Sequence, residues 1–319
     1  MSLKEYVLTE LENNRDRYVS GQELADRFGV SRCAVWKAIN TLRDSGYDIE
    51  SNTHRGYQLS PDCDRLAEEP IRAALTDKSL PVYVLPTVDS TNAEAKRILS
   101  QQAPKRFLVV AEEQTAGRGR LGRGFYSPRA AGLYMTLVMS PDALADDVVG
   151  MTSFAAVCTV EAIEELTGKT PQIKWVNDLY LDGKKITGIL TEAVSDVETG
   201  MVSHVLVGIG VDLRPCEVPE ELEGVVGNLD CRSGIRNPLA AGIANRLLTF
   251  GQGMADAMNR YRKYSLVLGK GVRYTKSGCE YHGRAVDIDD RGALVVHRDD
   301  GSIDLLQSGE ISLRVQPEQ

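Results

Sequence analysis

Residues 111–127 constrain the fold more than any other segment, because a loop rich in glycine and arginine directly follows an apolar stretch. Four glycines alternate there with three arginines: Gly117, Arg118, Gly119, Arg120, Gly122, Arg123 and Gly124. Glycine permits positive φ and close backbone approach to a ligand, and successive exposed N–H groups can bind an anion. Arginine adds planar donors suited to phosphate or carboxylate. The segment is not a Walker A loop, since no Gly-Lys-Ser/Thr follows. Alone, it is equally compatible with a flexible surface loop or a basic contact with nucleic acid.

Length and composition indicate an ordinary globular chain of two or three domains. It has 319 residues, of which 42% are hydrophobic and 26% charged, enough for a full core. The net charge of −8 excludes an overall basic field, so any DNA contact must come from a local patch. The six cysteines are scattered without a Cys-x-x-Cys pair. We therefore expect reduced thiols, a cytoplasmic location and no protein-held metal site. No signal peptide or membrane-length apolar run is visible, so no membrane contact is expected.

Residues 1–62 predict a winged helix-turn-helix domain. Leu3, Val7, Leu8 and Leu11 share one face of a first helix. A second short helix over 22–28 ends at Gly29, and Ser31 is a good N-cap for a third helix to about Arg43. Two alternating stretches, 47–49 and 56–59, predict the hairpin wing.

The third predicted helix is locally basic in an acidic domain. Residues 31–43 contain three basic and no acidic residues, whereas residues 1–65 contain 9 Lys/Arg against 11 Asp/Glu. Such a local charge pattern is what DNA phosphates require. The alternative is a solvated helix face in a module used only for protein contacts. We predict that DNA is contacted by Ser31, Arg32, Trp36, Lys37, Asn40 and, in the wing, Arg55 with His54.

Residues 63–267 predict an α/β domain with one central sheet flanked by helices. The expected strands cover 82–85, 107–111, 132–139, 173–175, 179–181, 185–193 and 204–211. The expected helices cover 92–101, 146–166 and, as one or two helices, 239–264. From residue 268 to 319 the pattern changes to five short strands separated by turns at Asp290–Gly292 and Asp299–Gly301. We expect a small SH3-like β-barrel there, and an α+β chain overall.

Several motifs in fixed order then carry a resemblance. They are 89–92 (DSTN), Gln114 with 117–123 (GRGRLGR), 174–179 (KWVNDL), 184–190 (KKITGIL), 207–212 (VGIGVD) and 309–314 (GEISLR). Each motif is weak alone, but their joint occurrence behind a winged helix is specific. Over essentially its whole length the chain resembles the bifunctional bacterial biotin protein ligases that also repress the biotin operon.

The chain departs from the family pattern at three places. Val176 stands where the family usually has proline, and Asp212 stands where asparagine is common. Segment 213–238 contains no tryptophan, although one family member has an aromatic residue there that stacks on adenine. The last two departures concern nucleotide binding.

The resemblance implies a reaction in which biotin and ATP form biotinyl-5′-adenylate before a carrier lysine is acylated. The nucleophile is then the substrate carboxylate, so the chain needs charge and positioning rather than a nucleophilic side chain. Lys185, Arg118 and Arg120 are the implied catalytic cations. The implied biotin and adenylate contacts are Ser90, Thr91, Asn92, Gln114, Gly117, Arg118, Gly119, Arg120, Asn177, Asp178, Lys185, Gly188, Gly208 and Arg314.

Structural alternatives stay open at several of these positions. Asn92 could be only a helix cap, 177–178 only a turn, and Gly188 and Gly208 only marks of a bulge. Asn177 and Asp178 are also candidates for the Mg²⁺ that accompanies ATP. The implied partners are a biotin carrier domain of a carboxylase, operator DNA and, with the adenylate bound, a second copy of the chain. Competing readings are a ligand sensor without chemistry, a ligase whose winged helix does not bind DNA, and a lipoate ligase.

Overall fold

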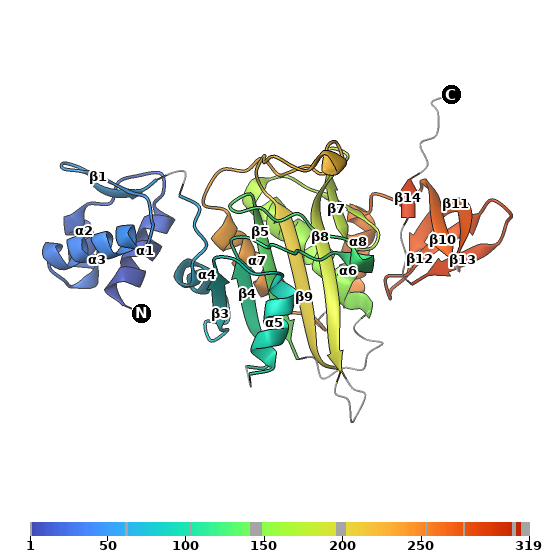
Figure 1. Ribbon diagram of the computed structural model, residues 1–319, viewed down its shortest axis with the longest axis horizontal. Helices are drawn as coiled ribbons and strands as arrows, with labels where there is room; N and C mark the ends of the chain where they lie inside the picture. Colours follow the sequence, from blue (N-terminus) through green and yellow to red (C-terminus); the bar gives the residue numbers. More distant parts are fainter. Residues whose placement is uncertain are drawn as a thin grey trace.

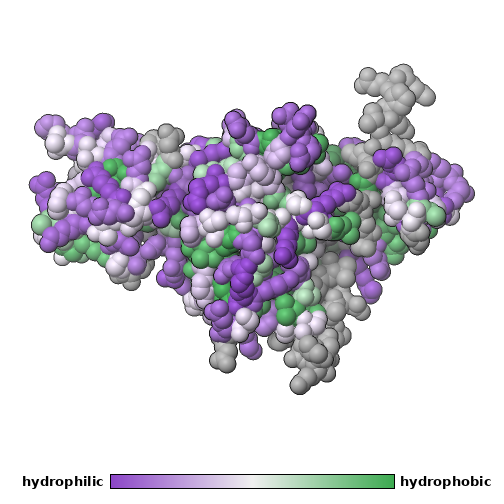
Figure 2. Space-filling model, in the orientation of Figure 1, coloured by the Kyte–Doolittle hydropathy of each residue, from purple (hydrophilic) through white to green (hydrophobic). Residues whose placement is uncertain are grey.

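The computed structural model describes residues 2–60, 63–101, 104–140, 149–195, 202–252, 254–276, 278–307 and 311–313. Three units follow one another along the chain, with the N-terminal unit and the C-terminal sheet at opposite ends of the long axis (Figure 1). Hydrophilic residues cover most of the face seen in Figure 2, and apolar residues occur there in smaller patches. No described helix is both long and apolar enough to cross a bilayer.

The N-terminal unit has the predicted winged helix-turn-helix order: α1 (Leu3–Asn13), α2 (Gly21–Phe28), α3 (Arg32–Asp44), β1 (Ile49–Asn52) and β2 (Gly56–Leu59). Ser31 caps α3, since its Oγ accepts from the amide of Ala34 at 3.2 Å. Gly29 ends α2 at φ 63°, a left-handed conformation that favours glycine. Val35, Ile39 and Leu42 of α3 are buried in the unit's own apolar core.

The central unit is a seven-stranded sheet in the order β3-β4-β5-β9-β8-β7-β6. Only the pair β3–β4 is parallel. Its strands are β3 (Val82–Leu85), β4 (Phe107–Ala111), β5 (Gly132–Met139), β6 (Gln172–Lys174), β7 (Asp178–Leu181), β8 (Lys184–Ser195) and β9 (Val202–Asp212). The helices are α4 (Glu68–Ala74), α5 (Thr91–Leu99), α6 (Val149–Thr167), α7 (Arg236–Leu247) and α8 (Met254–Tyr264). The predicted first residues of α6, 146–148, lie outside the described residues.

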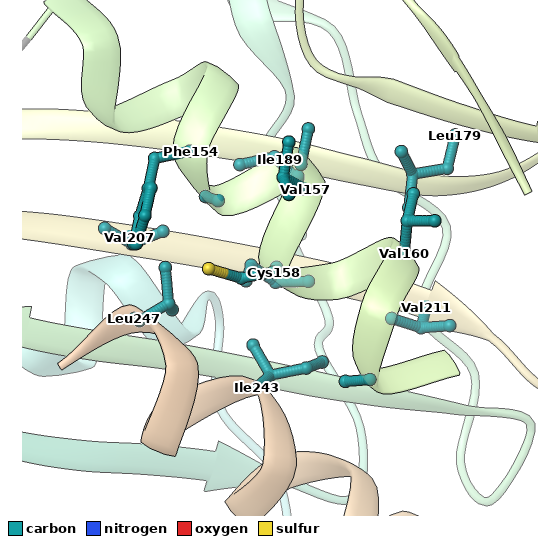
Figure 3. Packing of buried hydrophobic residues seen from close by; sticks show 14 of the residues in the cluster. Phe154, Val157, Cys158, Val160, Leu179, Ile189, Val207, Val211, Ile243 and Leu247 are labelled. Atoms are coloured by element: carbon teal, nitrogen blue, oxygen red, sulfur yellow. The ribbon is translucent and has the colours of Figure 1, made fainter. Parts of the chain in front are cut away.

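Alternation along the strands separates the two faces of the sheet. Leu133, Met135 and Leu137 of β5 join the large core with α6 and α7, whereas Val138 packs with Ala95 of α5 on the other face. Figure 3 shows Phe154, Val157 and Val160 of α6 beside residues of the sheet, whereas Cys158 lies towards Ile243 and Leu247 of α7. The helix α6 is apolar on most sides because it is covered by sheet and helices together.

The C-terminal unit is a five-stranded antiparallel sheet in the order β13-β12-β11-β10-β14. Its strands are β10 (Gly271–Lys276), β11 (Cys279–Ile288), β12 (Leu294–Arg298), β13 (Ile303–Leu306) and β14 (Ile311–Leu313). The indole N–H of Trp175 donates to the carbonyl of Gly292 at 2.9 Å, which joins this unit to the central one.

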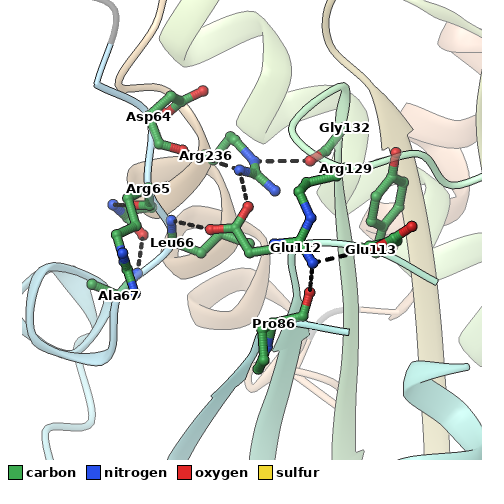
Figure 4. A network of polar contacts seen from close by, with 12 residues as sticks. Asp64, Arg65, Leu66, Ala67, Pro86, Glu112, Glu113, Arg129, Gly132 and Arg236 are labelled. Carbon is green, nitrogen blue, oxygen red and sulfur yellow. Dashed lines mark hydrogen bonds and ion pairs between the residues drawn. The ribbon is translucent and has the colours of Figure 1, made fainter. Parts of the chain in front are cut away.

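A buried arginine joins the N-terminal linker to the central sheet (Figure 4). Arg236 is fully buried, and its guanidinium donates to the carbonyls of Gly132 at 2.8 Å and Asp64 at 3.0 Å, and to Glu112 at 2.6 Å. The second oxygen of Glu112 accepts from the amide of Leu66 at 2.9 Å. The linker is therefore held by specific polar contacts to β4, β5 and α7.

Candidate active site and nucleic-acid interface

The glycine-arginine segment forms a narrow loop closed by its own backbone. The amide of Phe125 donates to the carbonyl of Gly117 at 2.9 Å, and that of Gly119 to the carbonyl of Arg123 at 2.7 Å. Of the four glycines only Gly122 has positive φ, 76°. Gly117 is needed for close approach instead, because a Cβ there would lie 2.3 Å from the carbonyl oxygen of Phe125. Both uses of glycine expected from the sequence thus occur, at different positions.

The loop borders two cavities that meet at shared residues. The larger is about 260 Å³ and the smaller about 20 Å³. Both are lined by Arg118, Phe125, Gly188 and Leu190. The smaller cavity has room for about one water molecule. The two are therefore the ends of one site that the loop and the Phe125 ring divide.

The larger cavity is cationic. Its wall includes Arg118, Arg120, Arg123, Lys174 and Lys185, and a single carboxylate, Asp178. Such an excess of fixed positive charge suits a phosphate or a developing anion. Ile311 of the C-terminal sheet also lies in this wall, so the third unit helps to enclose the site.

Two of these cations are already positioned by neutral or acidic partners. Lys185 forms an ion pair with Asp178 at 2.8 Å, and its backbone pairs with segment 225–227. Arg120 donates to the Oδ1 of Asn177 at 3.0 Å, and the Nδ2 of Asn177 donates to the carbonyl of Ile189 at 2.8 Å. Asn177 and Asp178 therefore orient cations from β7, which the sequence alone did not distinguish from a plain turn.

The smaller cavity has a group of neutral polar side chains in its wall. Ser90, Thr91, Asn92 and Gln114 line it. The Oε1 of Gln114 accepts from the amide of Thr91 at 2.8 Å, and its Nε2 donates to the hydroxyl of Ser127 at 2.8 Å. Ser90 occupies the N-cap position of α5 without a side-chain cap bond, so its hydroxyl is not consumed by the helix end.

Three glycines on neighbouring strands leave room for side chains above the sheet. Gly188 pairs with Gly210, and Leu190 with Gly208, in regular register. A Cβ on Gly210 would lie 2.3 Å from the ring of Phe125, and one on Gly208 would lie 2.3 Å from the Oδ1 of Asn92. These glycines therefore mark close packing and not bulges.

Asp212, at the end of β9, has an altered acidity. Burial raises the pKa of its carboxyl to about 8, although the nearby Lys185 acts in the opposite direction. Near neutral pH this side chain is therefore largely a neutral carboxylic acid. It then resembles an amide in charge, at a position where the sequence departs from the expected asparagine.

The structure brings most of the predicted ligand residues together around the two cavities. Arg314 lies outside the described residues, so its predicted contact stays a prediction. Phe125, Gly210 and Trp175 were not predicted. Gly188 was expected to allow close approach of the backbone to a ligand, but nothing in the sequence indicated that the ring of Phe125 would lie there.

The predicted DNA-binding residues lie mostly on one exposed face of α3. Ser31, Arg32, Trp36 and Lys37 are exposed, whereas Asn40 is half-buried. Arg55 of the wing is exposed, with its guanidinium 4.2 Å from the centre of the Tyr18 ring. The third basic residue of the helix, Arg43, points inward and donates to the carbonyl of Ile49. The charge available to DNA is thus carried by Arg32 and Lys37.

Three sequence families match in the order of the three units. They are an HTH domain over 4–58, the biotin/lipoate A/B protein ligase family over 84–212 and the biotin protein ligase C-terminal domain over 267–314. The bifunctional ligase/repressor BirA of Bacillus subtilis is 34% identical over 310 residues, covering 93% of this chain and 94% of that protein. The Escherichia coli protein of the same name is 32% identical, covering 92% of each. The chain belongs to the biotin protein ligase family, among its bifunctional ligase/repressor members.

Solved structures of the family agree with the fold of this ligase-family chain. A biotin protein ligase from Aquifex aeolicus, in complex with biotin and ATP, is 27% identical with a TM-score of 0.62. The alignment covers 73% of this chain and 98% of the Aquifex aeolicus chain. Together with the matched HTH and C-terminal families, this confirms the α+β fold class predicted from the sequence.

Proposed function

We propose that the chain is an ATP-dependent biotin protein ligase and also a biotin-responsive transcriptional repressor. The observation that carries the proposal is the divided site, with a neutral polar end at Ser90 and Gln114 and a cationic end at Lys185 and Arg120. A ligand with a polar uncharged ring at one end and a carboxylate at the other fits this polarity. Biotin has that chemistry, with a ureido ring and a valerate carboxylate.

The proposed reaction has two steps. A biotin carboxylate oxygen attacks the α-phosphate of ATP, which enters with Mg²⁺ as part of the substrate, and pyrophosphate leaves. The Nζ of a carrier lysine then attacks the acyl carbon of the mixed anhydride, forming an amide, and AMP leaves with the bonding pair. Lys185, Arg118 and Arg120 would stabilise the negative charge that gathers on the phosphate oxygens. Asp178 and Asn177 would hold Lys185 and Arg120 in place.

The exposed basic face of α3 supports operator binding. A helix-turn-helix places its second helix in the major groove, where Arg32 and Lys37 would contact backbone or base edges. Since two cations per copy give weak binding, two copies on a two-fold operator would add their contacts.

The edge of β8 supports pairing of two copies. β9 covers one side of β8, whereas β7 pairs with it only as far as Gly188. Among the described strands, none pairs with the outer edge of β8 from Leu190 to Ser195. Such an edge offers free N–H and C=O groups to a second strand. We propose side-by-side pairing of two central sheets once the adenylate has ordered the site loops.

Intact-mass measurement tests the ligase activity. A biotin carrier domain incubated with the protein, biotin and ATP should gain the mass of one biotinyl group on a lysine. Lipoate replaces biotin in a parallel reaction, and a lipoyl gain in place of a biotinyl gain would assign the chain to lipoate transfer. Sedimentation and DNA-shift titrations, with and without biotin plus ATP, test whether dimer fraction and operator affinity rise together.

A further inference from the structure

Asn92 is a hydrogen-bonded amide in the wall of the smaller cavity. It lies in the first turn of α5, 3% exposed. Its Oδ1 accepts from the hydroxyl of Thr136 at 2.6 Å. Its Nδ2 donates to the carboxylate of Glu192 at 2.8 Å and to the carbonyl of Leu190 at 3.3 Å. Both amide hydrogens are therefore used, and one lone pair on Oδ1 remains free.

Glu192, together with the more distant carbonyl of Leu190, decides which way this amide faces, since neither group can donate. An ionised carboxylate only accepts hydrogen bonds, so it must face the Nδ2 of Asn92, and Oδ1 must then face Thr136 and Gly208. Burial disfavours ionisation of Glu192, but hydrogen bonds from Lys96 and Asn92 outweigh it and hold the pKa of Glu192 below its ordinary value. Lys96, one turn after Asn92 on α5, donates to the other oxygen of Glu192 at 2.7 Å. The hydroxyl of Thr136 can donate or accept, so it cannot set the orientation by itself.

We propose that Glu192 is a positioning residue that makes Asn92 present an acceptor, and not a donor, to the bound ring. The inference rests on the proposed function, since the ring is taken to be the ureido ring of biotin. A ureido group has two N–H donors, and one of them would meet the free lone pair of Oδ1. The bare backbone of Gly208 leaves space for this oxygen. Glu192 itself lines neither cavity and acts only through Asn92.

The substitution Glu192→Gln separates orientation from mere packing. A glutamine has one acceptor oxygen, and the charged Lys96 would take it. The glutamine NH₂ would then face the Nδ2 of Asn92, a donor against a donor. This contact disfavours the orientation that presents Oδ1 to the ring, which the carbonyl of Leu190 at 3.3 Å would still favour. Removing the lysine as well, in Glu192→Gln with Lys96→Met, frees the glutamine oxygen to accept from Nδ2 again. The second substitution should therefore rescue the first.

Steady-state biotinylation of a carrier domain by the full-length protein tests the proposal. We expect Glu192→Gln to raise the KM for biotin about 10-fold, the scale of one lost buried hydrogen bond. The kcat and the KM for ATP should stay within about twofold, since Glu192 does not touch the reacting atoms. Lys96→Met alone should change the KM for biotin by less than about twofold, because exposed ion pairs contribute little. The double variant should return to within about threefold of wild type.

Thermal unfolding of each variant checks that it folds. An unchanged KM for biotin in Glu192→Gln would overturn the inference, as would a double variant no better than the single one. Equal losses in kcat and in both KM values would also overturn it, since they indicate a general structural role. If the wild-type protein transferred lipoate but not biotin, the proposed function would fail first, and this inference with it.

Discussion

The cations of the ligand site and those of α3 differ in what holds them. In the ligand site, Lys185 and Arg120 contact Asp178 and Asn177, and the surrounding loop and strands are bonded to one another. On α3, Arg32 and Lys37 are exposed, and among the described residues their side chains have no ion-pair or hydrogen-bond partner. A site built for chemistry is preorganised before its ligand binds, whereas a surface that binds DNA keeps its charges free until phosphates arrive.

This difference predicts different consequences of substitution. A change at the ligand site leaves a former partner unpaired in a partly closed pocket. A substitution at Arg32 or Lys37 of α3 leaves no described protein group without a partner, because both side chains face solvent. The Arg236 network lies between the two regions, and it is more buried than either.

Loss of Arg236 should have the largest effect. Arg236→Met keeps an apolar stem but leaves Glu112 and two carbonyls without their donor. Breaking a buried ion pair from one side costs roughly 3–5 kcal/mol of unfolding free energy. Urea unfolding measures this loss, and Arg260→Met serves as control because Arg260 pairs with Asp256 and Glu161 near the surface. Similar losses in the two variants would mean that the linker contacts contribute no more than a surface pair.

Loss of the Lys185 charge should have the next largest effect, on rate and not on stability. Lys185→Gln keeps length but removes the cation that we propose faces the α-phosphate, so transition-state stabilisation should fall more than substrate binding. We expect adenylation to slow by roughly 10²–10³, the scale for one lost electrostatic donor. Pyrophosphate release in single-turnover reactions measures it. The matched control is Lys184→Gln, since the adjacent Lys184 is exposed. An equal slowing in both variants would remove the special role of Lys185.

The sequence was informative about elements and motifs but not about contacts between distant segments. Strands 82–85, 107–111 and 132–139 were predicted with their observed bounds, since apolar runs bounded by polar turns are distinctive. The residues at 90–92, 114 and 185 were indicated by the family resemblance and not by their residue types alone. Arg236 and Glu192 gave no signal, because each is one charged residue among many and its role depends on partners 124 and 100 positions away. Phe125 was likewise indistinguishable from a core aromatic.

Neutralising α3 should change DNA binding alone. Arg32→Ala with Lys37→Ala should weaken operator affinity about 10–100-fold at moderate salt and lower the salt dependence by about one unit of slope per lost phosphate contact. Ligation and thermal unfolding should stay near wild type, because both side chains are exposed. DNA-shift titrations over a salt series measure the effect. Lys263→Ala with Lys270→Ala removes the same charge from an exposed region elsewhere. If the control lost as much operator affinity, the effect would come from the change in net charge and not from the two positions on α3.

The smallest expected effect concerns Asp212 and depends on pH. Its carboxyl has a folded pKa of about 8, above the ordinary value of 3.8, so the folded protein holds the proton more tightly than the unfolded chain. The stability that this group contributes is therefore complete below pH 3.8 and is lost as the pH rises through about 8. Asp212→Asn cannot titrate, and it keeps the neutral shape.

The unfolding free energy of Asp212→Asn should accordingly increase relative to that of wild type as the pH rises. The residue keeps some contact with solvent, so we expect a relative gain on the order of 1–2 kcal/mol between pH 5 and pH 8. Unfolding free energies measured across this range for wild type, Asp212→Asn and the exposed Asp16→Asn separate the effect from a loss of net charge. Parallel curves for wild type and Asp212→Asn would mean that the carboxylate is ionised throughout. A second anion would then lie near Lys185 in addition to Asp178, and the contrast between the partnered cations of the ligand site and the free cations of α3 would be larger still.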